Sequence, residues 1–475
     1  MKKRAFGRIA GTLGGACALV WSVPAGAQQF MQDRRVQDGP GYEAGDFEIH
    51  PGLGAEVGYD SNYYGRSDKS DPHYVNGSPQ NPPVGTGLLR VTPSLRLSTT
   101  PGSPRGEDQP AQRPSVSFDA GASGTYREYF SNQVSNQRNM SGSADATLGI
   151  LPGRAWSGTV NANWTRMIQP TVLGNPDLSY NNDTIIAGAD LAAQPNEGTL
   201  DWHFGYQYTG IFFEQASGSP YNNQMHTGYS RGRWKFRPRT ALLYDGSISF
   251  RSFDNASSAQ FAEHSSAPVR VRLGLEGLVT PRFSVLAFVG YGATFTSGGS
   301  SDASVQQYDS VIGQAELRFF PGTTSTEVQA KPSLLVSTIA LGYTRDFQAS
   351  YLGPAYGSDR GYLRAEYFYA GKFLITVEGG VGALEHPNLY FNSSPGVAPI
   401  LMADAYTDVR ADATLFTEYR IIQSIGINAT FQYSENFSST QLPVTSDDLV
   451  RVGNYSLFDQ SWRRFQAFFG VRWLM

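Results

Sequence analysis

The chain has 475 residues, of which 13% are aromatic and only 16% are charged, and it contains 52 glycines. Its formal charge of −4 provides no general attraction to nucleic acid, which argues against nucleic acid as a partner. No run of about eighteen apolar residues follows the N-terminal segment, and this argues against membrane-spanning helices. The mean hydropathy of −0.33 still allows a membrane β-barrel, because only every second residue of a barrel strand faces lipid.

The segment 1–27 predicts a secretory signal peptide. Basic residues precede an apolar stretch at 9–23, and small residues at 25–27 form a cleavage site. The alternatives are an uncleaved anchor and a lipoprotein that starts at Cys17, but the apolar stretch is short and interrupted by glycine. Since Cys17 is the only cysteine, cleavage leaves a chain without cysteine, and the loss of four basic residues lowers its formal charge from −4 to −8. We expect a short periplasmic segment at 28–46 before the first strand.

Alternating apolar and polar residues from residue 47 to the C-terminus predict β-strands. Between Phe47 and Tyr59 the apolar side chains occupy the odd positions, and the same period of two recurs at 89–97 and 409–415. About eighteen such segments begin near residues 47, 87, 114, 137, 155, 180, 198, 222, 240, 267, 282, 307, 333, 359, 372, 404, 422 and 461. An even number of strands is expected of bacterial single-chain barrels, because both termini then lie on the periplasmic side.

The connections between these segments alternate in length. Tight turns such as 151–153 and 280–282 alternate with long loops rich in Asn, Ser, Gly and Pro, such as 61–85 and 387–400. A soluble β-sandwich or propeller, the alternative, predicts neither this alternation nor aromatic residues gathered at strand ends. The sequence therefore predicts an all-β fold, a transmembrane antiparallel up-and-down β-barrel of outer-membrane type at 47–475, embedded in outer-membrane lipid.

A membrane barrel must close, because an open sheet in lipid leaves the N–H and C=O groups of its edge strands unpaired. The last strand, 465–475, is therefore expected to pair with the first. This strand resembles the C-terminal signal that the barrel-assembly machinery recognises, with Gly470 before two spaced hydrophobic residues, Trp473 and Met475. It departs from that signal because the final residue is not aromatic and because Phe468 stands where a polar residue is usual.

A barrel of about eighteen strands encloses a water-filled lumen unless a separate element plugs it, and the segment before the first strand is too short for a plug domain. The period of two directs two sets of charged residues into this lumen. The predicted basic wall consists of Arg231, Arg233, Lys235, Arg237, Arg251, Arg270 and Arg272, and the predicted acidic wall of Asp119, Asp145, Glu316, Asp408, Asp412 and Glu418. Opposed walls of this kind select solutes by charge. The alternative is that these charges face water and balance one another.

The sequence contains no catalytic or metal-binding motif in a suitable setting. The string Gly228-Tyr229-Ser230-Arg231-Gly232 matches the Gly-x-Ser-x-Gly pattern of hydrolases, but that serine needs a sharp strand-to-helix turn, and here a strand pattern continues. The parity of this strand also turns Ser230 toward lipid. The six histidines include no His-x-x-x-His pair and no cysteine partner, so we predict neither an enzyme nor a metal or other cofactor.

The first predicted strand ends in Tyr59-Asp60-Ser61-Asn62-Tyr63, and a second strand follows at 89–97. This arrangement resembles the first hairpin of the outer-membrane β-barrel porins associated with exopolysaccharide gene clusters, in which a Tyr-Asp-x-Asn-aromatic string ends the first strand. The resemblance implies a conduit that secretes an exopolysaccharide or capsular polysaccharide, with a separate periplasmic export component as its partner. A general diffusion porin for small polar solutes and a structural or adhesive barrel that acts through its long loops are the alternatives.

Overall fold

The computed structural model describes residues 41–68, 82–99, 115–135, 137, 139–169, 181–195, 198–215, 218–254, 263–298, 302–321, 337–348, 355–369, 372–391, 398–443 and 457–475. The predicted signal peptide and most of the segment 28–46 lie outside these residues. No helix in the described part of the chain is long and apolar enough to cross a membrane.

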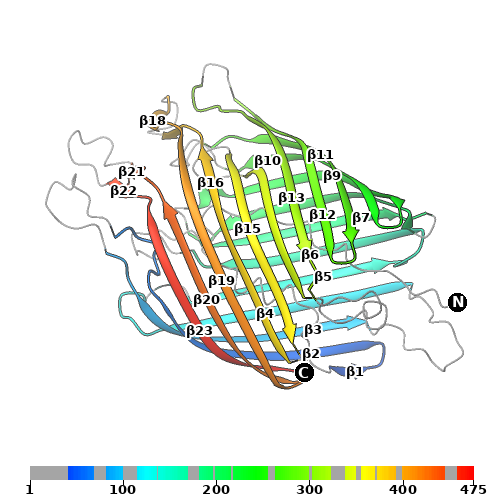
Figure 1. Cartoon of the computed structure of the whole chain (residues 1–475). Coiled ribbons are helices and arrows are strands. Elements are labelled where there is room, and N and C mark those ends of the chain that lie inside the picture. The colour runs from blue at the N-terminus through cyan, green and yellow to red at the C-terminus, as the bar shows by residue number, and fades with distance from the viewer. Residues whose placement is uncertain are drawn as a thin grey trace, which may run out of the picture.

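Among the described residues, eighteen antiparallel strands form a closed barrel in which each strand pairs with its neighbours in chain order (Figure 1). These strands are β2 (Phe47–Asp60), β3 (Thr86–Thr99), β4 (Val116–Tyr129), β5 (Met140–Ile150), β6 (Trp156–Met167), β7 (Asn182–Ala193), β8 (Leu200–Phe213), β9 (Asn223–Arg237), β10 (Thr240–Phe253), β11 (Ser266–Thr280), β12 (Phe283–Thr296), β13 (Tyr308–Phe319), β14 (Thr338–Gln348), β15 (Tyr356–Tyr369), β16 (Phe373–His386), β19 (Tyr406–Ile422), β20 (Ile425–Phe437) and β23 (Trp462–Leu474). The shorter elements are β1 (Tyr42–Ala44), β17 (Leu389–Phe391), β18 (Ile400–Ala403), β21 (Gln441–Pro443), β22 (Leu457–Asp459) and the 3₁₀ helix η4 (Ser219–Tyr221). The predicted antiparallel up-and-down barrel of about eighteen strands is confirmed.

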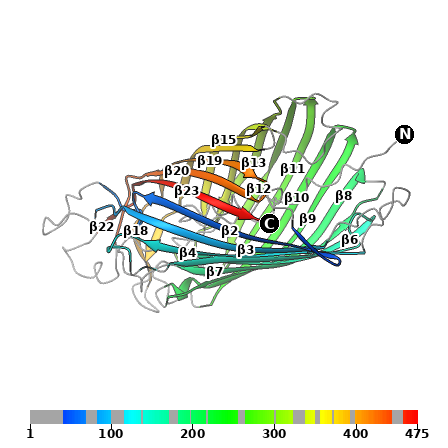
Figure 2. The same ribbon diagram turned by 90° about the horizontal axis from the view of Figure 1, so that it is seen from below.

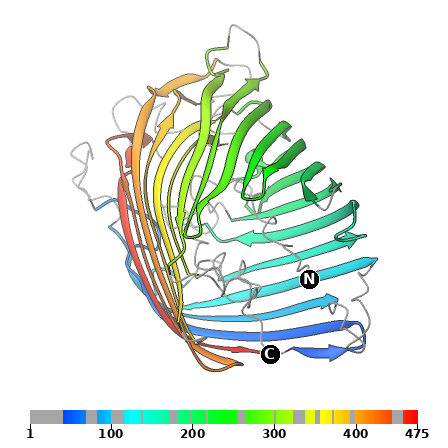
Figure 3. The ribbon, with the colours of Figure 1, turned by 45° about the vertical axis from the view of Figure 1, so that its right-hand side comes forward.

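The barrel closes between its last and first strands. β23 pairs with β20 on one side and with β2 on the other, so that Asp60 faces Gln466 and Gly52 faces Leu474 in the register. The two strands lie side by side, as the view from below shows (Figure 2). The strands of the near and far walls cross at a steep angle, which is expected when tilted strands close into a barrel (Figure 3).

The two faces of the wall differ in polarity as the sequence pattern predicts. On β2, Val57 and Tyr59 are about half exposed on the outside, whereas Glu56 and Asp60 on the inside are buried. The same alternation recurs on the last strand, where Phe469 is exposed and Phe468 is buried. An apolar exterior around a polar interior is the reverse of a soluble protein, and it suits a barrel surrounded by lipid.

The connections at the two ends of the barrel also differ as predicted. At one end tight turns join β5 to β6, β9 to β10, β11 to β12 and β19 to β20. The connections from β3 to β4 and from β13 to β14 are longer and also lie at this end. At the other end two connections carry the small hairpins β17–β18 and β21–β22. We call the loop-rich end the outer end and the tight-turn end the inner end.

The short strand β1 precedes the first barrel strand. It forms a hairpin with the inner end of β2, in which Ala44 faces Phe47. The pairing of β23 with β2 ends at Gly52, and β1 pairs with the residues of β2 before that point. The chain end is held at the same place, because the Met475 N–H donates to the Pro51 carbonyl at 3.0 Å. Part of the segment predicted to precede the barrel therefore belongs to its sheet.

Candidate functional site in the barrel lumen

The predicted basic residues of β9 point into the lumen. Trp234 and Phe236, between them in the sequence, are 52% and 42% exposed on the outside, so the strand parity turns Arg231, Arg233 and Lys235 inward. The last member, Arg237, ends β9 and is exposed at the tight turn.

The other members of the predicted basic wall lie on the next two strands. Arg231 faces Asp245 on β10, and Asp245 in turn faces Arg272 on β11. Arg270 lies one inward position nearer the outer end, and Arg251 lies close to the outer end of β10. The structure therefore brings the seven residues together on one face of three adjacent strands.

Carboxylates lie among these basic residues on the same face, so the wall does not carry positive charge alone. Asp245 binds Arg272 at 3.0 Å, and Glu276 binds Arg233 at 3.2 Å. Arg231 lies farther from a carboxylate than Arg233 and Arg272 do, because its distance to Asp190 is 3.8 Å. Asp245 and Glu276 carry the same inward parity as the arginines, and this signal is present in the sequence.

The carboxylates near Arg231 also contact a histidine. His203 on β8 places Nδ1 2.5 Å from Asp190 and Nε2 3.0 Å from Asp201. Each ring nitrogen therefore lies within hydrogen-bond distance of a carboxylate. Asp190 also accepts a hydrogen bond from the Tyr229 hydroxyl at 3.0 Å. Asp190 is thus shared among His203, Tyr229 and Arg231.

The predicted acidic wall does not form as a single wall. Its members are spread around the circumference, with Asp119 and Asp145 on β4 and β5, Glu316 on β13, and Asp408, Asp412 and Glu418 on β19. Arginines pair with several of them: Arg96 with Asp119, Arg318 with Glu316, Arg360 with Asp412 at 2.7 Å, and Arg472 with Glu418 at 2.5 Å. The sequence pattern gave the direction of each side chain but not its partner across strands.

Two tyrosine side chains of the lumen lie along the wall. The Tyr229 ring lies over Gly205 of the neighbouring strand and reaches Asp190 two strands away. Tyr362 on β15 crosses Gly342 in the same way and donates to Glu316 on β13. A Cβ atom at Gly205 or Gly342 would lie 2.1 or 2.2 Å from the ring, so the ring would have to move. The arrangement lines the lumen with polar groups while leaving its centre free of these rings.

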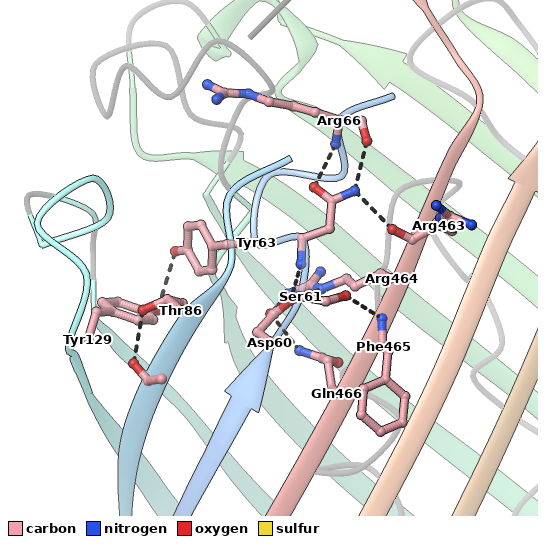
Figure 4. Close-up of polar contacts among 12 residues, drawn as sticks. Asp60, Ser61, Tyr63, Arg66, Thr86, Tyr129, Arg463, Arg464, Phe465 and Gln466 are labelled. Atoms are coloured by element: carbon pink, nitrogen blue, oxygen red, sulfur yellow. Dashed lines mark hydrogen bonds and ion pairs between the residues drawn. The ribbon is translucent and has the colours of Figure 1, made fainter. Parts of the chain in front are cut away.

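The string that carried the family resemblance closes the barrel seam (Figure 4). Asp60 accepts hydrogen bonds from Arg464 and from Gln466 Nε2, the latter at 2.8 Å. Ser61 exchanges two bonds with the Phe465 backbone, at 2.9 and 2.8 Å. Asn62 Nδ2 donates to the Arg463 carbonyl at 2.9 Å. These consecutive residues therefore fasten the first strand to the last.

The residues after this string fold into the outer end of the barrel. Tyr63 and Tyr64 form an apolar cluster with Tyr129, Val134 and Phe468, all of them buried. Burial raises the pKa of the Tyr63 hydroxyl, which bonds the Tyr129 hydroxyl at 3.2 Å. The inward Phe468, which departs from the assembly signal, packs here with the Arg90 guanidinium 3.5 Å from its ring centre. An apolar residue at this position therefore has a packing role.

The serine of the hydrolase-like string lies in a regular strand and on the outside. Ser230 accepts a hydrogen bond from Trp202 Nε1 at 2.9 Å, and its strand pairs without interruption with β8. The turn that presents a catalytic serine is therefore missing at this position. No group of three or more His, Cys, Asp or Glu side chains suited to a metal ion occurs in the described part of the chain.

Comparisons with known proteins give no family for this chain. No protein-family model and no curated protein matches it. Among solved structures, the chain is similar to OpdQ of Pseudomonas aeruginosa, with 10% identity and a TM-score of 0.44 over 90% of this chain and 98% of that one. It is similar to OpdL of the same organism, with 12% identity and a TM-score of 0.42 over 91% and 99%. The FrpB iron transporter of Neisseria meningitidis gives 8% identity and a TM-score of 0.42 over 90% and 81%.

Proposed function

We propose that the protein is an outer-membrane channel that conducts small polar solutes and favours anions. The observation that carries the proposal is a closed barrel of eighteen strands with an apolar outside and a lumen lined by arginines. Barrels of sixteen to eighteen strands enclose an aqueous passage, and their exterior matches lipid.

The preference for anions follows from the charges on one part of the lumen wall. On the inward face of β7 to β11, cations outnumber carboxylates. The cations are Arg231, Arg233, Lys235, Arg237, Arg251, Arg270 and Arg272, and the carboxylates are Asp190, Asp201, Asp245 and Glu276. A surplus of fixed positive charge along a low-dielectric wall raises the local concentration of anions.

Secretion of an anionic polysaccharide is the second candidate. The observation that favours it is the pairing of lumen guanidinium groups with aromatic rings, such as Arg231 with Tyr229 at 5.3 Å and Arg360 with Tyr362 at 5.7 Å. An aromatic face accepts a sugar ring, and a guanidinium binds a carboxylate or phosphate. The Tyr-Asp-x-Asn-aromatic string no longer argues for this cargo, because its residues act at the barrel seam. A channel for small solutes therefore fits at least as well.

The test of the anion preference is the reversal potential of single channels in a salt gradient. Replacing Arg231, Arg233 and Lys235 together by Gln should shift selectivity toward cations and leave the barrel folded. A matched control that removes the same charge replaces Arg154, Arg239 and Arg282, which are exposed at inner turns. An unchanged reversal potential in the lumen variant, or an equal shift in the control, would refute the role of the basic wall.

The two candidate cargoes are separated by blockade of the same current. An anionic oligosaccharide should block the channel for long times if a polysaccharide passes through it, and the block should weaken in the lumen variant. A current that responds to small anions but stays indifferent to the oligosaccharide supports the small-solute channel.

A further inference from the structure

The wall of the barrel opens between β13 and β14 near the outer end. The ladder between these strands stops at Gly313 and Arg345, whereas the ladder between β14 and β15 continues to Gln348 and Tyr356. The outer residues of β13, from Tyr308, pair with β12 only, within the described strands. The outer end of the β14–β15 hairpin has therefore separated from β13.

This end of the hairpin lies inside the lumen. Odd-numbered residues of β14 face outward as far as Tyr343, which is 45% exposed, but Phe347 is only 2% exposed. The Phe347 ring packs on the inner face of β12, 2.5 Å from where a Cβ of Gly292 would stand, and against Ile312 of β13. The ladder between β14 and β15 has no register shift, so Phe347 keeps the parity of Tyr343. It is buried because the strand crosses the inner face of β12 and β13 and packs this side chain against that face.

One arginine of the basic wall holds the hairpin in this position. Arg270 on β11 donates from Nε to Asp346 at 3.0 Å and from Nη2 to the Phe347 carbonyl at 2.6 Å. Its guanidinium carbon also lies 4.0 Å from the centre of the Phe347 ring. Three contacts from one side chain therefore bind residues that belong to a strand three positions away in the sheet.

The sequence of β14 also suits a second arrangement. If the ladder with β13 continued in register beyond Gly313, Phe347 would face Val311 on the outside, and Asp346 would face Ile312 on the inside. Val311 is 60% exposed on the lipid side, so an aromatic ring beside it would be well placed. Asp346 would then face the water of the lumen. Switching transitions use packed elements with two discrete positions of this kind.

We propose that the outer end of the β14–β15 hairpin, residues 345–348 and 355–357, is a gate that Arg270 holds in the closed position. When it is released, the hairpin rejoins β13 and the lumen widens. This inference rests on the proposed channel function, because a gate controls flow through the lumen.

Two engineered disulfides test the gate, and they share one position. Gly292→Cys with Phe347→Cys traps the hairpin inside the lumen, and Val311→Cys with Phe347→Cys traps it against β13. The chain without its first 27 residues has no other cysteine, so each pair contains the only thiols. Phe347→Cys alone is the control for oxidation. We expect a lower, steady conductance in the first trap, a higher one in the second, and the same value for both proteins after reduction.

The outcomes distinguish a failure of the gate proposal from a failure of the proposed channel function. Equal conductance in the two oxidised proteins, or failure of the second disulfide to form in the folded barrel under oxidising conditions, overturns the gate. Absence of current from every folded protein, reduced or oxidised, overturns the channel itself. As a second variant, Arg270→Gln should raise mean conductance and add transitions between two current levels, and a single unchanged level contradicts the holding role of Arg270.

Discussion

Removing the Asp60 carboxylate should destabilise the barrel at its seam. The side chain is 2% exposed and accepts hydrogen bonds from Arg464, from Gln466 and from the Asn62 backbone N–H at 3.0 Å. In Asp60→Ala these donors lose their acceptor, and the Arg464 charge stays buried without its counter-ion. Breaking a buried ion pair by removing one partner costs about 3–5 kcal/mol, so we expect a loss of that size in the free energy of unfolding.

The assay is urea unfolding of the barrel in lipid vesicles, followed by the gel mobility of the folded and unfolded forms. Asp60→Asn, which keeps the volume and one acceptor, should lose about 2 kcal/mol. Asp404→Ala, at an exposed position near the outer end, should change the value by less than about 0.5 kcal/mol. A double-mutant cycle with Arg464→Ala should give a coupling energy above about 1 kcal/mol. A loss below about 1 kcal/mol in Asp60→Ala, or purely additive effects, would show that the seam does not depend on this carboxylate.

Two further predictions concern the wall and the outer loops. Gly205→Ala should cost about 1–3 kcal/mol, because its methyl group displaces the Tyr229 ring, whereas Gly228→Ala on the next strand meets open space and serves as the control in the same unfolding assay. Acid should loosen the outer loops at His264, which forms a hydrogen bond with Ser304 at 2.8 Å. Burial lowers the pKa of His264. The stability that the neutral ring gives to the loops is therefore present above about pH 6.5 and is lost as the pH falls. The measurement is the protection of the amides at residues 263–265 and 302–305, that is, their hydrogen-exchange rate relative to the intrinsic rate at each pH. Protection that does not change between about pH 8 and 5 would contradict the prediction.

The sequence predicted the barrel well because apolar and polar residues alternate along each strand, and this alternation indicates which face of the strand meets lipid. Polarity alone placed Arg231 inward and Phe469 outward, and the need to pair every edge predicted that the last strand joins the first. This reasoning holds wherever the wall is regular, because a shift of one residue would turn every side chain to the wrong face.

The partners of these side chains were beyond sequence reasoning, because they depend on register and on reach across strands. Tyr229 meets Asp190 only because a glycine on the intervening strand lets the ring pass. Phe347 follows an outward pattern in the sequence and yet lies inside, because the ladder that would hold it outside stops at Arg345. The string that begins at Tyr59 resembles a family signature in the sequence, and the structure gives its residues from Asp60 onward a physical role at the seam.

The measurement that tests the central proposal most directly is the current carried by the purified, refolded barrel in a planar bilayer under a salt gradient. The account predicts a steady conductance whose reversal potential shows a preference for anions. Absence of current from demonstrably folded barrels, or a clear preference for cations, would contradict it.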